Sequence, residues 1–250
     1  IKPSMTASMD IAHAAGIVAE KGGDTAHASI LARALEIPAV LSVKGILEKV
    51  GNGDSIIIDG AYGEVFINPT QRTLSIYEKK KKKYEEHIEE LKTFINKSTE
   101  TADGKKVMIA ANIGGAEEAA KAVKAGAEGV GLFRTEFLFL NKSALPTEEE
   151  QFEEYKKAAV LTKGMPLTIR TLDIGGDKDI PYMGLTKETN PFLGYRAIRF
   201  CLDRVDIFTT QLRAILRASA YGSIRIMIPM ITSVNEIRQV KELIKKICSN

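Results

Sequence analysis

The hydrophobic pattern of the first 70 residues predicts a small α/β domain. Segments 10–20 and 25–35 are followed by three short apolar runs, which glycines separate, at residues 39–43, 55–59 and 64–68. Helical and strand patterns that alternate at this spacing, with turn residues between them, are typical of a mixed domain. The chain opens at Ile1 without a methionine, so we expect an internal fragment in which this domain, residues 1–70, is truncated at its N-terminus.

Residues 71–100 have a different pattern, that of one long helix. Neither proline nor glycine interrupts them, and Tyr77, Tyr84, Ile88, Leu91 and Ile95 recur at heptad-like intervals. This spacing predicts a helix over residues 75–97 that links the regions on either side. The lysine run 79–83 is followed at once by glutamates, which is typical of a solvated helix face, and His87 among those glutamates is expected at the surface.

From residue 101 to 250 a strand pattern followed by a helical pattern recurs. The predicted strands are residues 105–112, 128–136, 166–174 and 224–231, and the helical patterns are 116–126, 148–161, the segment from Pro191 onward and 234–247. Repeated βα units predict a parallel sheet, either doubly wound or closed into a (β/α) barrel. Because an eight-stranded barrel has eight such units, this region would form half of one. The predicted fold class is α/β.

Composition narrows the possible partners. The net charge is only +3 with acids and bases intermixed, which argues against nucleic acid. Two distant cysteines, Cys201 and Cys248, indicate neither a disulfide framework nor a zinc site, so a reducing cytoplasm is expected and both cysteines are expected to be structural. No apolar run approaches the roughly 18 residues that span a bilayer, and no signal peptide is evident, so we expect a soluble protein without membrane insertion.

One of the three histidines, His27, lies in a pattern suited to binding an anion. Thr25 is a candidate N-cap, which places His27 in the first turn of a helix, where free N–H groups and the helix dipole favour negative charge. The preceding Gly22 and Gly23 allow close backbone approach to a ligand. His27 could instead be covered by the apolar residues three and four positions further on, and spacing alone leaves both interpretations open.

Arginines at strand ends form a second candidate site. Arg134 and Arg170 end consecutive predicted strands, and in a βα barrel such ends line one face, so the two guanidiniums should converge. Guanidinium groups suit phosphate and carboxylate, although a single arginine at a strand end is also often a surface ion pair. Asn190 can cap, and Pro191 can open, a helix that presents Arg196 and Arg199.

Four stretches together carry a resemblance to a known family. The stretch "GGDTAHASILARALEIPAV" resembles the phosphohistidine motif of phosphoenolpyruvate-utilising enzymes. The stretches "GVGLFRTEFLFL", "RTLDIGGDKDIPY" and "NPFLGYRAIR" are similar to the enzyme I branch of that family, the phosphotransferases of bacterial sugar uptake. The resemblance runs essentially from end to end.

The resemblance implies both an architecture and an activity. Residues 1–70 would be the swivelling phosphohistidine domain, 71–100 the helical linker and 101–250 the first four βα units of a (β/α)8 phosphoenolpyruvate-binding barrel. His27 would accept the phosphoryl group on Nε2 and pass it to the carrier protein HPr, with Arg134, Arg170 and Arg196 binding phosphoenolpyruvate. The resemblance also implies Mg²⁺, with ligands beyond residue 250, and a homodimer at full length, so the fragment alone is expected to be inactive.

Two residues depart from the family pattern, and two other functions remain open. Asp24 and Ala26 stand where the family has other residues, and Asp24 places a negative charge close to a site that should hold phosphate. The alternatives are a pyruvate phosphate dikinase or phosphoenolpyruvate synthase of the same superfamily, and a non-catalytic protein that binds an anion or a partner through its arginines. The sequence does not identify the sugars served.

Overall fold

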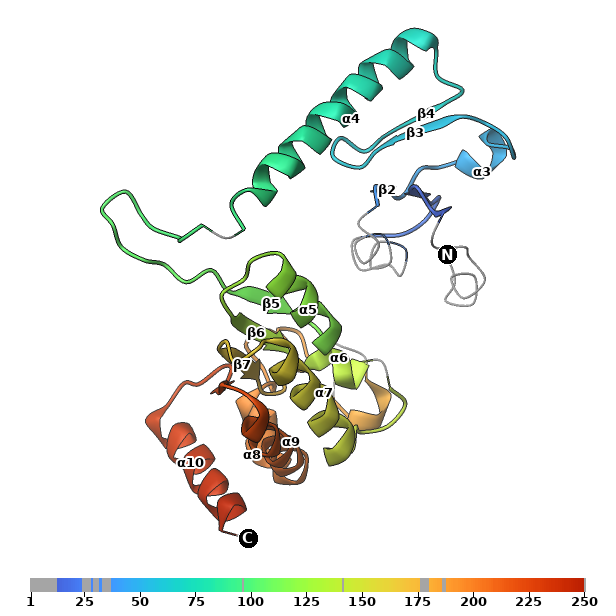
Figure 1. Cartoon of the computed structure of the whole chain (residues 1–250). Helices are drawn as coiled ribbons and strands as arrows, with labels where there is room; N and C mark the ends of the chain where they lie inside the picture. Colours follow the sequence, from blue (N-terminus) through green and yellow to red (C-terminus); the bar gives the residue numbers. More distant parts are fainter. Residues whose placement is uncertain are drawn as a thin grey trace. The chain divides into compact units, whose positions relative to one another are not determined.

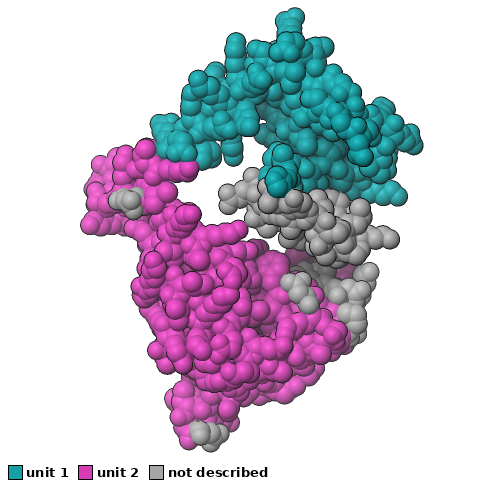
Figure 2. All heavy atoms as spheres, turned by 45° about the vertical axis from the view of Figure 1, so that its right-hand side comes forward, with its two compact units in different colours: residues 1–90 teal, residues 91–250 magenta. Residues whose placement is uncertain are grey.

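The computed structural model describes residues 13–23, 28, 32, 37–95, 97–140, 142–175, 180–185 and 188–249. The chain forms two compact units, unit 1 from residue 1 to 90 and unit 2 from residue 91 to 250, coloured separately in Figure 2. The boundary falls inside the segment 71–100 that the sequence predicts to be a linker. Each unit is described by itself.

Unit 1 contains two small strand pairs. Strand β1 (Ile17–Val18) pairs in parallel with β2 (Ala39–Val40), and β3 (Ile56–Asp59) pairs with β4 (Glu64–Ile67) in antiparallel register. The prediction of strands at 55–59 and 64–68 is confirmed to within a residue, whereas the run 39–43 is a strand only in its first two residues. Ser42 adopts a φ of 62°, which ends the extended conformation there.

The core of unit 1 joins strand and helical residues. Ile17 is buried together with Ala28 and Ala32, which lie four positions apart and have helical geometry. Residues four apart share one helix face, so these two alanines lie on the same side of the helical backbone. A short helix, α3 (Ile46–Lys49), follows β2.

Helix α4 (Gln71–Lys92) is the long helix drawn in turquoise in Figure 1. It begins four residues before the predicted start at residue 75, because the Thr70 side chain caps it by accepting a hydrogen bond from the Thr73 N–H at 3.2 Å. It ends before the predicted residue 97, because Phe94 and Ile95 bond three residues back in tighter turns. None of its described side chains is buried.

Unit 2 is built on a parallel four-stranded sheet in the order β5-β6-β7-β8. The strands are β5 (Ala111–Ile113), β6 (Val130–Arg134), β7 (Leu167–Arg170) and β8 (Ile224–Met227). The predicted succession of four parallel strands is confirmed. Spatial order follows chain order without reversal, so these strands contain no switch point of the doubly wound kind. Among the described strands β5 and β8 have one neighbour each, and a closed barrel is therefore not formed by them.

In the part of unit 2 that the structure describes, six α-helices accompany this sheet (Figure 1): α5 (Ala116–Lys124), α6 (Glu136–Leu140), α7 (Glu148–Leu161), α8 (Ile198–Asp203), α9 (Val205–Ala218) and α10 (Val234–Cys248). Helix α7 packs between α5 and α9. Capping boxes at Thr147 and Ser233 fix where α7 and α10 begin, since each side chain accepts from the third helical N–H while the glutamate there bonds back.

Two hydrophobic clusters fill unit 2. One lies between the sheet and helices α5, α7 and α9 and includes Phe133 and Tyr155, whose rings meet edge to face. The other includes Phe139, Phe208 and Leu212 and extends to the inner face of α10. The helices predicted over residues 116–126, 148–161 and 234–247 are confirmed, each to within two residues of the expected bounds.

Two predictions in unit 2 are wrong in detail. The apolar run 107–109, expected inside the first strand, is exposed, because residues 99–107 form a small hairpin with an antiparallel bridge between Glu100 and Lys106. The helix expected from Pro191 begins only at Ile198, since Ala197 has a φ of 53° and the Tyr195 N–H donates to the Glu188 carboxylate. Arg196 therefore lies just before α8 rather than on a helix.

Candidate functional site

Adjacent strand ends bring Arg134 and Arg170 together. Each is the last residue of its strand, and the two are register partners in the parallel pair β6–β7. Parallel strands place their carboxyl ends at the same edge of a sheet, so both side chains start from one edge. The predicted adjacency of these two strand ends is confirmed. Convergence of the two guanidiniums on one ligand stays a prediction.

Two carboxylates hold the Arg170 guanidinium. Nη2 is ion-paired with Oε1 of Glu136, the first residue of α6, and Nη1 lies 3.2 Å from Oδ2 of Asp173. The Glu136 side chain is only 3% exposed. Contacts to two separate carboxylates fix a planar guanidinium more firmly than either contact alone.

Asp173 joins the third arginine to this cluster. Its Oδ1 lies 3.0 Å from both Nε and Nη2 of Arg196, while its other oxygen contacts Arg170. One carboxylate thus bridges two guanidiniums that are 26 positions apart in the chain. Arg199, which the sequence also offered, donates instead to the carbonyls of Leu193 and Gly194 and fixes the preceding turn.

Arg134 has a different environment. Its guanidinium carbon lies 5.0 Å from the centre of the Phe137 ring, a cation–π contact, and its buried Nε has no hydrogen-bond partner in the described part of the chain. The other buried side-chain atoms in this condition among the described residues are Glu136 Oε2 and Arg170 Nε. Buried polar atoms are normally paired, so three such atoms at two strand ends indicate a place suited to a polar ligand.

A buried polar network supports these strand ends from behind. The Thr135 hydroxyl donates to the Arg170 carbonyl at 2.8 Å, and Gln211 Nε2 donates to Thr135 Oγ1 and to the Tyr155 hydroxyl, each at 3.2 Å. Gln211 Oε1 in turn accepts the Leu172 N–H at 2.9 Å. Helices α7 and α9 therefore lock β6 and β7 in the register that brings the arginines together.

Cys201 lies near the cluster but is not a nucleophile. Burial, and secondarily the charge of Asp173, raises the pKa of its thiol to about 12, and Sγ contacts the Leu172 carbonyl at 3.8 Å. A thiol with this pKa stays protonated near neutral pH. Both cysteines are free, Cys201 buried as a structural residue would be and Cys248 exposed, so the structural role expected for Cys248 finds no support.

The predicted histidine site lies mostly outside the described residues: Asp24, Thr25, Ala26 and His27 belong to the part of the chain that the structure does not describe. The flanking Gly22 is described, and its φ of 141° is a conformation that L side chains rarely adopt, which explains a glycine there. Its carbonyl accepts a hydrogen bond from the Ser42 hydroxyl at 2.7 Å.

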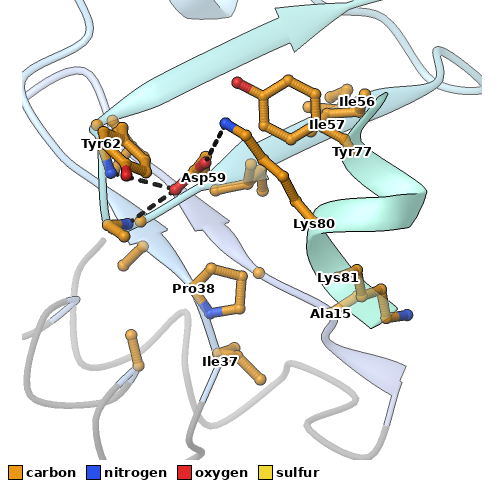
Figure 3. A pocket seen from close by; sticks show the side chains of 18 of the residues that line it. Ala15, Ile37, Pro38, Ile56, Ile57, Asp59, Tyr62, Tyr77, Lys80 and Lys81 are labelled. Atoms are coloured by element: carbon orange, nitrogen blue, oxygen red, sulfur yellow. Dashed lines mark hydrogen bonds and ion pairs between the residues drawn. The ribbon is translucent and has the colours of Figure 1, made fainter. Parts of the chain in front are cut away.

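Gly22 and Gly23 contribute to the wall of a large hollow in unit 1, of about 2030 Å³. Figure 3 shows Lys80 of α4 reaching Asp59 of β3, with Nζ to Oδ2 at 3.6 Å, while its amine also lies over the rings of Tyr62 and Tyr77. The Tyr77 hydroxyl donates to Glu64 at 2.5 Å, which raises the pKa of Tyr77. Lys80 and Asp59 at this wall are therefore engaged with each other.

The described residues form neither a metal site nor a membrane-spanning helix. No group of three or more histidine, cysteine or acidic side chains there could hold a metal ion. The two acids at the arginine cluster are bound to guanidiniums, so the described residues do not fit a Mg²⁺ site. No described helix is both long and apolar enough to cross a membrane.

The sequence missed the acids of this cluster, although a signal for both was present. Glu136 follows Arg134 by two positions, and Asp173 follows Arg170 by three, so each strand end carries an acid directly after its base. Three guanidiniums against two carboxylates give a cluster with excess positive charge and unsatisfied N–H groups. Such a cluster can bind a phosphate, a carboxylate or a small molecule that carries both.

The family of the chain agrees with this chemistry. Residues 88–250 match the model of the phosphoenolpyruvate-binding domain of phosphoenolpyruvate-utilising enzymes, and residues 1–63 match that of their mobile domain. The chain belongs to the phosphoenolpyruvate-utilising enzymes.

Its similar relatives share one description. The phosphoenolpyruvate-protein phosphotransferases of Bacillus sp. (strain S) and Geobacillus stearothermophilus are each 49% identical to it over 244 residues, which is 98% of this chain and 42% of theirs. That of Priestia megaterium is 48% identical, over 43% of its length. The chain thus spans less than half the length of these relatives. A solution structure of an enzyme I protein is 41% identical and covers 34% of each chain, with a TM-score of 0.32 that is too low to inform the fold.

Proposed function

We propose that this chain is part of a phosphoenolpyruvate-protein phosphotransferase, which moves the phosphoryl group of phosphoenolpyruvate onto His27 and from there to a carrier protein. The observation that carries the proposal is the arginine cluster at the ends of β6 and β7, with buried polar atoms that lack partners in the described chain. The family and the relatives supply the reaction. A pyruvate phosphate dikinase or synthase fits less well, because the relatives described above are protein phosphotransferases.

In this proposal Arg134, Arg170 and Arg196 bind the substrate. Phosphoenolpyruvate carries a phosphate and a carboxylate, and planar guanidiniums bind both groups through paired hydrogen bonds. Positive charge fixed beside the transferring phosphoryl group also stabilises the charge that develops on its oxygens. Arg134 is suited to this role because its Nε has no partner in the described chain and no described carboxylate forms an ion pair with it.

His27 is the proposed phosphoryl acceptor. A neutral imidazole is a competent nucleophile near pH 7, and transfer forms an N–P bond as the P–O bond to the enolate oxygen breaks. The enolpyruvate that leaves takes up a proton to become pyruvate. We propose that Gly22, Gly23 and Thr25 support this histidine, and that residues 1–70 swivel about the linker 71–100 to reach the arginines of a (β/α)8 barrel whose first four units are residues 101–250.

The remaining partners follow from the same proposal. The phosphoryl group would pass from His27 to HPr in sugar uptake, in the cytoplasm, where free thiols such as Cys201 persist. Mg²⁺ would be held by residues beyond residue 250, since the described acids do not fit it. The enzyme would act as a homodimer.

The experiment is phosphoryl transfer from radiolabelled phosphoenolpyruvate to a full-length enzyme that contains this chain. We expect acid-labile, base-stable label on His27, none in His27→Ala, and label formation slowed at least about tenfold in Arg134→Ala, because a charge-assisted contact is lost. Arg238→Ala is the matched control, since Arg238 is exposed on α10. Transfer between labelled His27 and HPr should survive in Arg134→Ala.

Three results would contradict the proposal. Label that persists in His27→Ala would show another acceptor. Equal loss in Arg134→Ala and Arg238→Ala would show that the arginine cluster has no special role, and binding of phosphoenolpyruvate without any transfer would favour a non-catalytic anion-binding protein.

A further inference from the structure

Glu136 occupies an unusual position for an acid. It is almost completely buried at a cluster that should attract anions, where one of its oxygens contacts Arg170 and the other, Oε2, is buried without a partner among the described residues. Burial of a carboxylate with an unfilled acceptor is costly, and its charge opposes anion binding nearby. An acid at this position therefore requires a reason beyond packing.

The strands do not need this acid to stay together. The Thr135 hydroxyl already joins the end of β6 to the Arg170 carbonyl at 2.8 Å, and Gln211 supports Thr135 from α9. The Glu136 contact goes instead to the guanidinium head of Arg170, the part that faces a ligand. What Glu136 controls is thus the direction of that head and not the register of the strands.

The two strand-end arginines differ in what surrounds their charge. The guanidinium of Arg170 is held by Glu136 and by Asp173, which leaves its buried Nε without a partner in the described chain. Arg134 is stacked on Phe137, and no carboxylate among the described residues forms an ion pair with it. Arg134 is therefore suited to attract an anion, and Arg170 to receive it in one orientation.

We propose that Glu136 is a positioning residue for the phosphoryl-transfer reaction: it fixes the direction of the Arg170 guanidinium at the expense of affinity for the anion. This inference rests on the proposed function. A fixed donor favours the reacting geometry over loose binding of the same charge, so the position of Arg170 raises turnover while the charge of Glu136 weakens ground-state binding. Asp173 also binds Arg196, so Glu136 is the cleaner probe.

The test uses two variants of a full-length enzyme. They separate the effect of the negative charge of Glu136 from the effect of its side-chain length. Glu136→Gln keeps the shape and removes the charge, whereas Glu136→Asp keeps the charge and withdraws it by one methylene. We expect Glu136→Gln to bind inorganic phosphate about tenfold more tightly and to lower KM for phosphoenolpyruvate, while kcat falls about tenfold or more. Glu136→Asp should lose kcat similarly without the gain in affinity. Calorimetry gives the first quantity and steady-state kinetics the others.

Glu148→Gln is the matched control. Glu148 is an acid of α7 that contacts Arg213 and Arg217 on the surface, so its loss removes the same charge away from the strand ends. It should leave kcat, KM and phosphate affinity unchanged.

The outcomes are distinguishable. Unchanged kcat in Glu136→Gln, weaker phosphate binding in that variant, or identical effects of the Gln and Asp variants would overturn the proposal. Failure of both variants to fold, judged by thermal melting, would also overturn it by showing a structural role. If the parent enzyme binds phosphate but transfers nothing from phosphoenolpyruvate, the proposed function fails, and a change in phosphate affinity confined to Glu136→Gln would still support the role of its charge.

Discussion

Unit 2 and unit 1 differ in how deeply their functional groups are supported. In unit 2 the arginines stand on strand ends above a core of large buried side chains such as Phe133, Tyr155 and Phe208. In the described part of unit 1 the strand pair β1–β2 is only two residues long on each side, and the described residues of α4 include none that is buried. The same chain thus combines a packed scaffold with a unit whose described contacts lie mostly near solvent.

This difference shows in which unit a charged side chain can be held in one direction. Hydrogen bonds hold a strand end firmly when they are shielded from water. The Thr135–Gln211–Tyr155 network provides such bonds behind the arginines, because helices α7 and α9 cover it. In unit 1 the contact of Lys80 with Asp59 is partly open to solvent, where ion pairs contribute little. Of the described parts of the two units, that of unit 2 is therefore better suited to orient a small anion.

The largest expected loss of stability comes from a substitution in the core of unit 2. Phe208→Ala removes a fully buried ring and should lower the free energy of unfolding of unit 2 by about 3–5 kcal/mol, since the cavity that remains cannot be refilled. Tyr84→Ala on α4, where the side chain is 67% exposed, is the control and should change stability by less than about 0.5 kcal/mol. Urea unfolding followed by hydrogen exchange and mass spectrometry reports each unit separately. Similar losses in both variants would remove the contrast between the units.

A smaller effect is expected from the buried polar network. Gln211→Met keeps the volume but leaves the Leu172 N–H without its acceptor, which should cost about 1–3 kcal/mol. Because the strand ends shift with it, phosphate affinity should fall as well. Denaturant unfolding and calorimetry with phosphate measure the two quantities. An unchanged affinity together with reduced stability would show that the network supports the fold and not the arginines.

Removing one helix cap from each unit gives a further comparison of their stability. Thr147→Ala removes the cap of α7 and should cost unit 2 about 1 kcal/mol, because α7 lies in its core. Thr70→Ala removes the equivalent cap of α4 and should speed hydrogen exchange only in the first turn of that helix. Peptide-resolved exchange makes the measurement. Global destabilisation by Thr70→Ala would mean that α4 is integral to a core of its own.

The last prediction concerns the two thiols and has no effect at neutral pH. Cys248 should react with a thiol reagent in the native protein near pH 8, whereas Cys201, which is buried and has a pKa of about 12, should react only after denaturation. The raised pKa also predicts a loss of stability at alkaline pH. Above about pH 9 the unfolded thiol ionises and the folded one does not, so stability falls with rising pH by about 1.4 kcal/mol per unit. Cys201→Ala should lose less between pH 8 and 10.5, and parallel curves for the two proteins would contradict the assignment.

The sequence by itself determined the mixed α/β class of the fold and the strand ends that carry Arg134 and Arg170. Period and turn residues predicted the four parallel strands of unit 2 and its amphipathic helices, because both signals are local. The ends of β6 and β7 followed from the same pattern, and with them the meeting of Arg134 and Arg170.

Only the tertiary structure decided which side chains contact these arginines. Asp173 bridges Arg170 and Arg196, and Glu136 holds Arg170 from a different element, contacts that no local pattern encodes because they depend on how turns fold back onto strand ends. The late start of α8 at Ile198 and the exposure of residues 107–109 likewise arise from competing contacts, such as Tyr195 with Glu188 and Glu100 with Lys106. Periodicity reports which face of an element is apolar, whereas long-range polar contacts decide where each element begins and which charge each arginine meets.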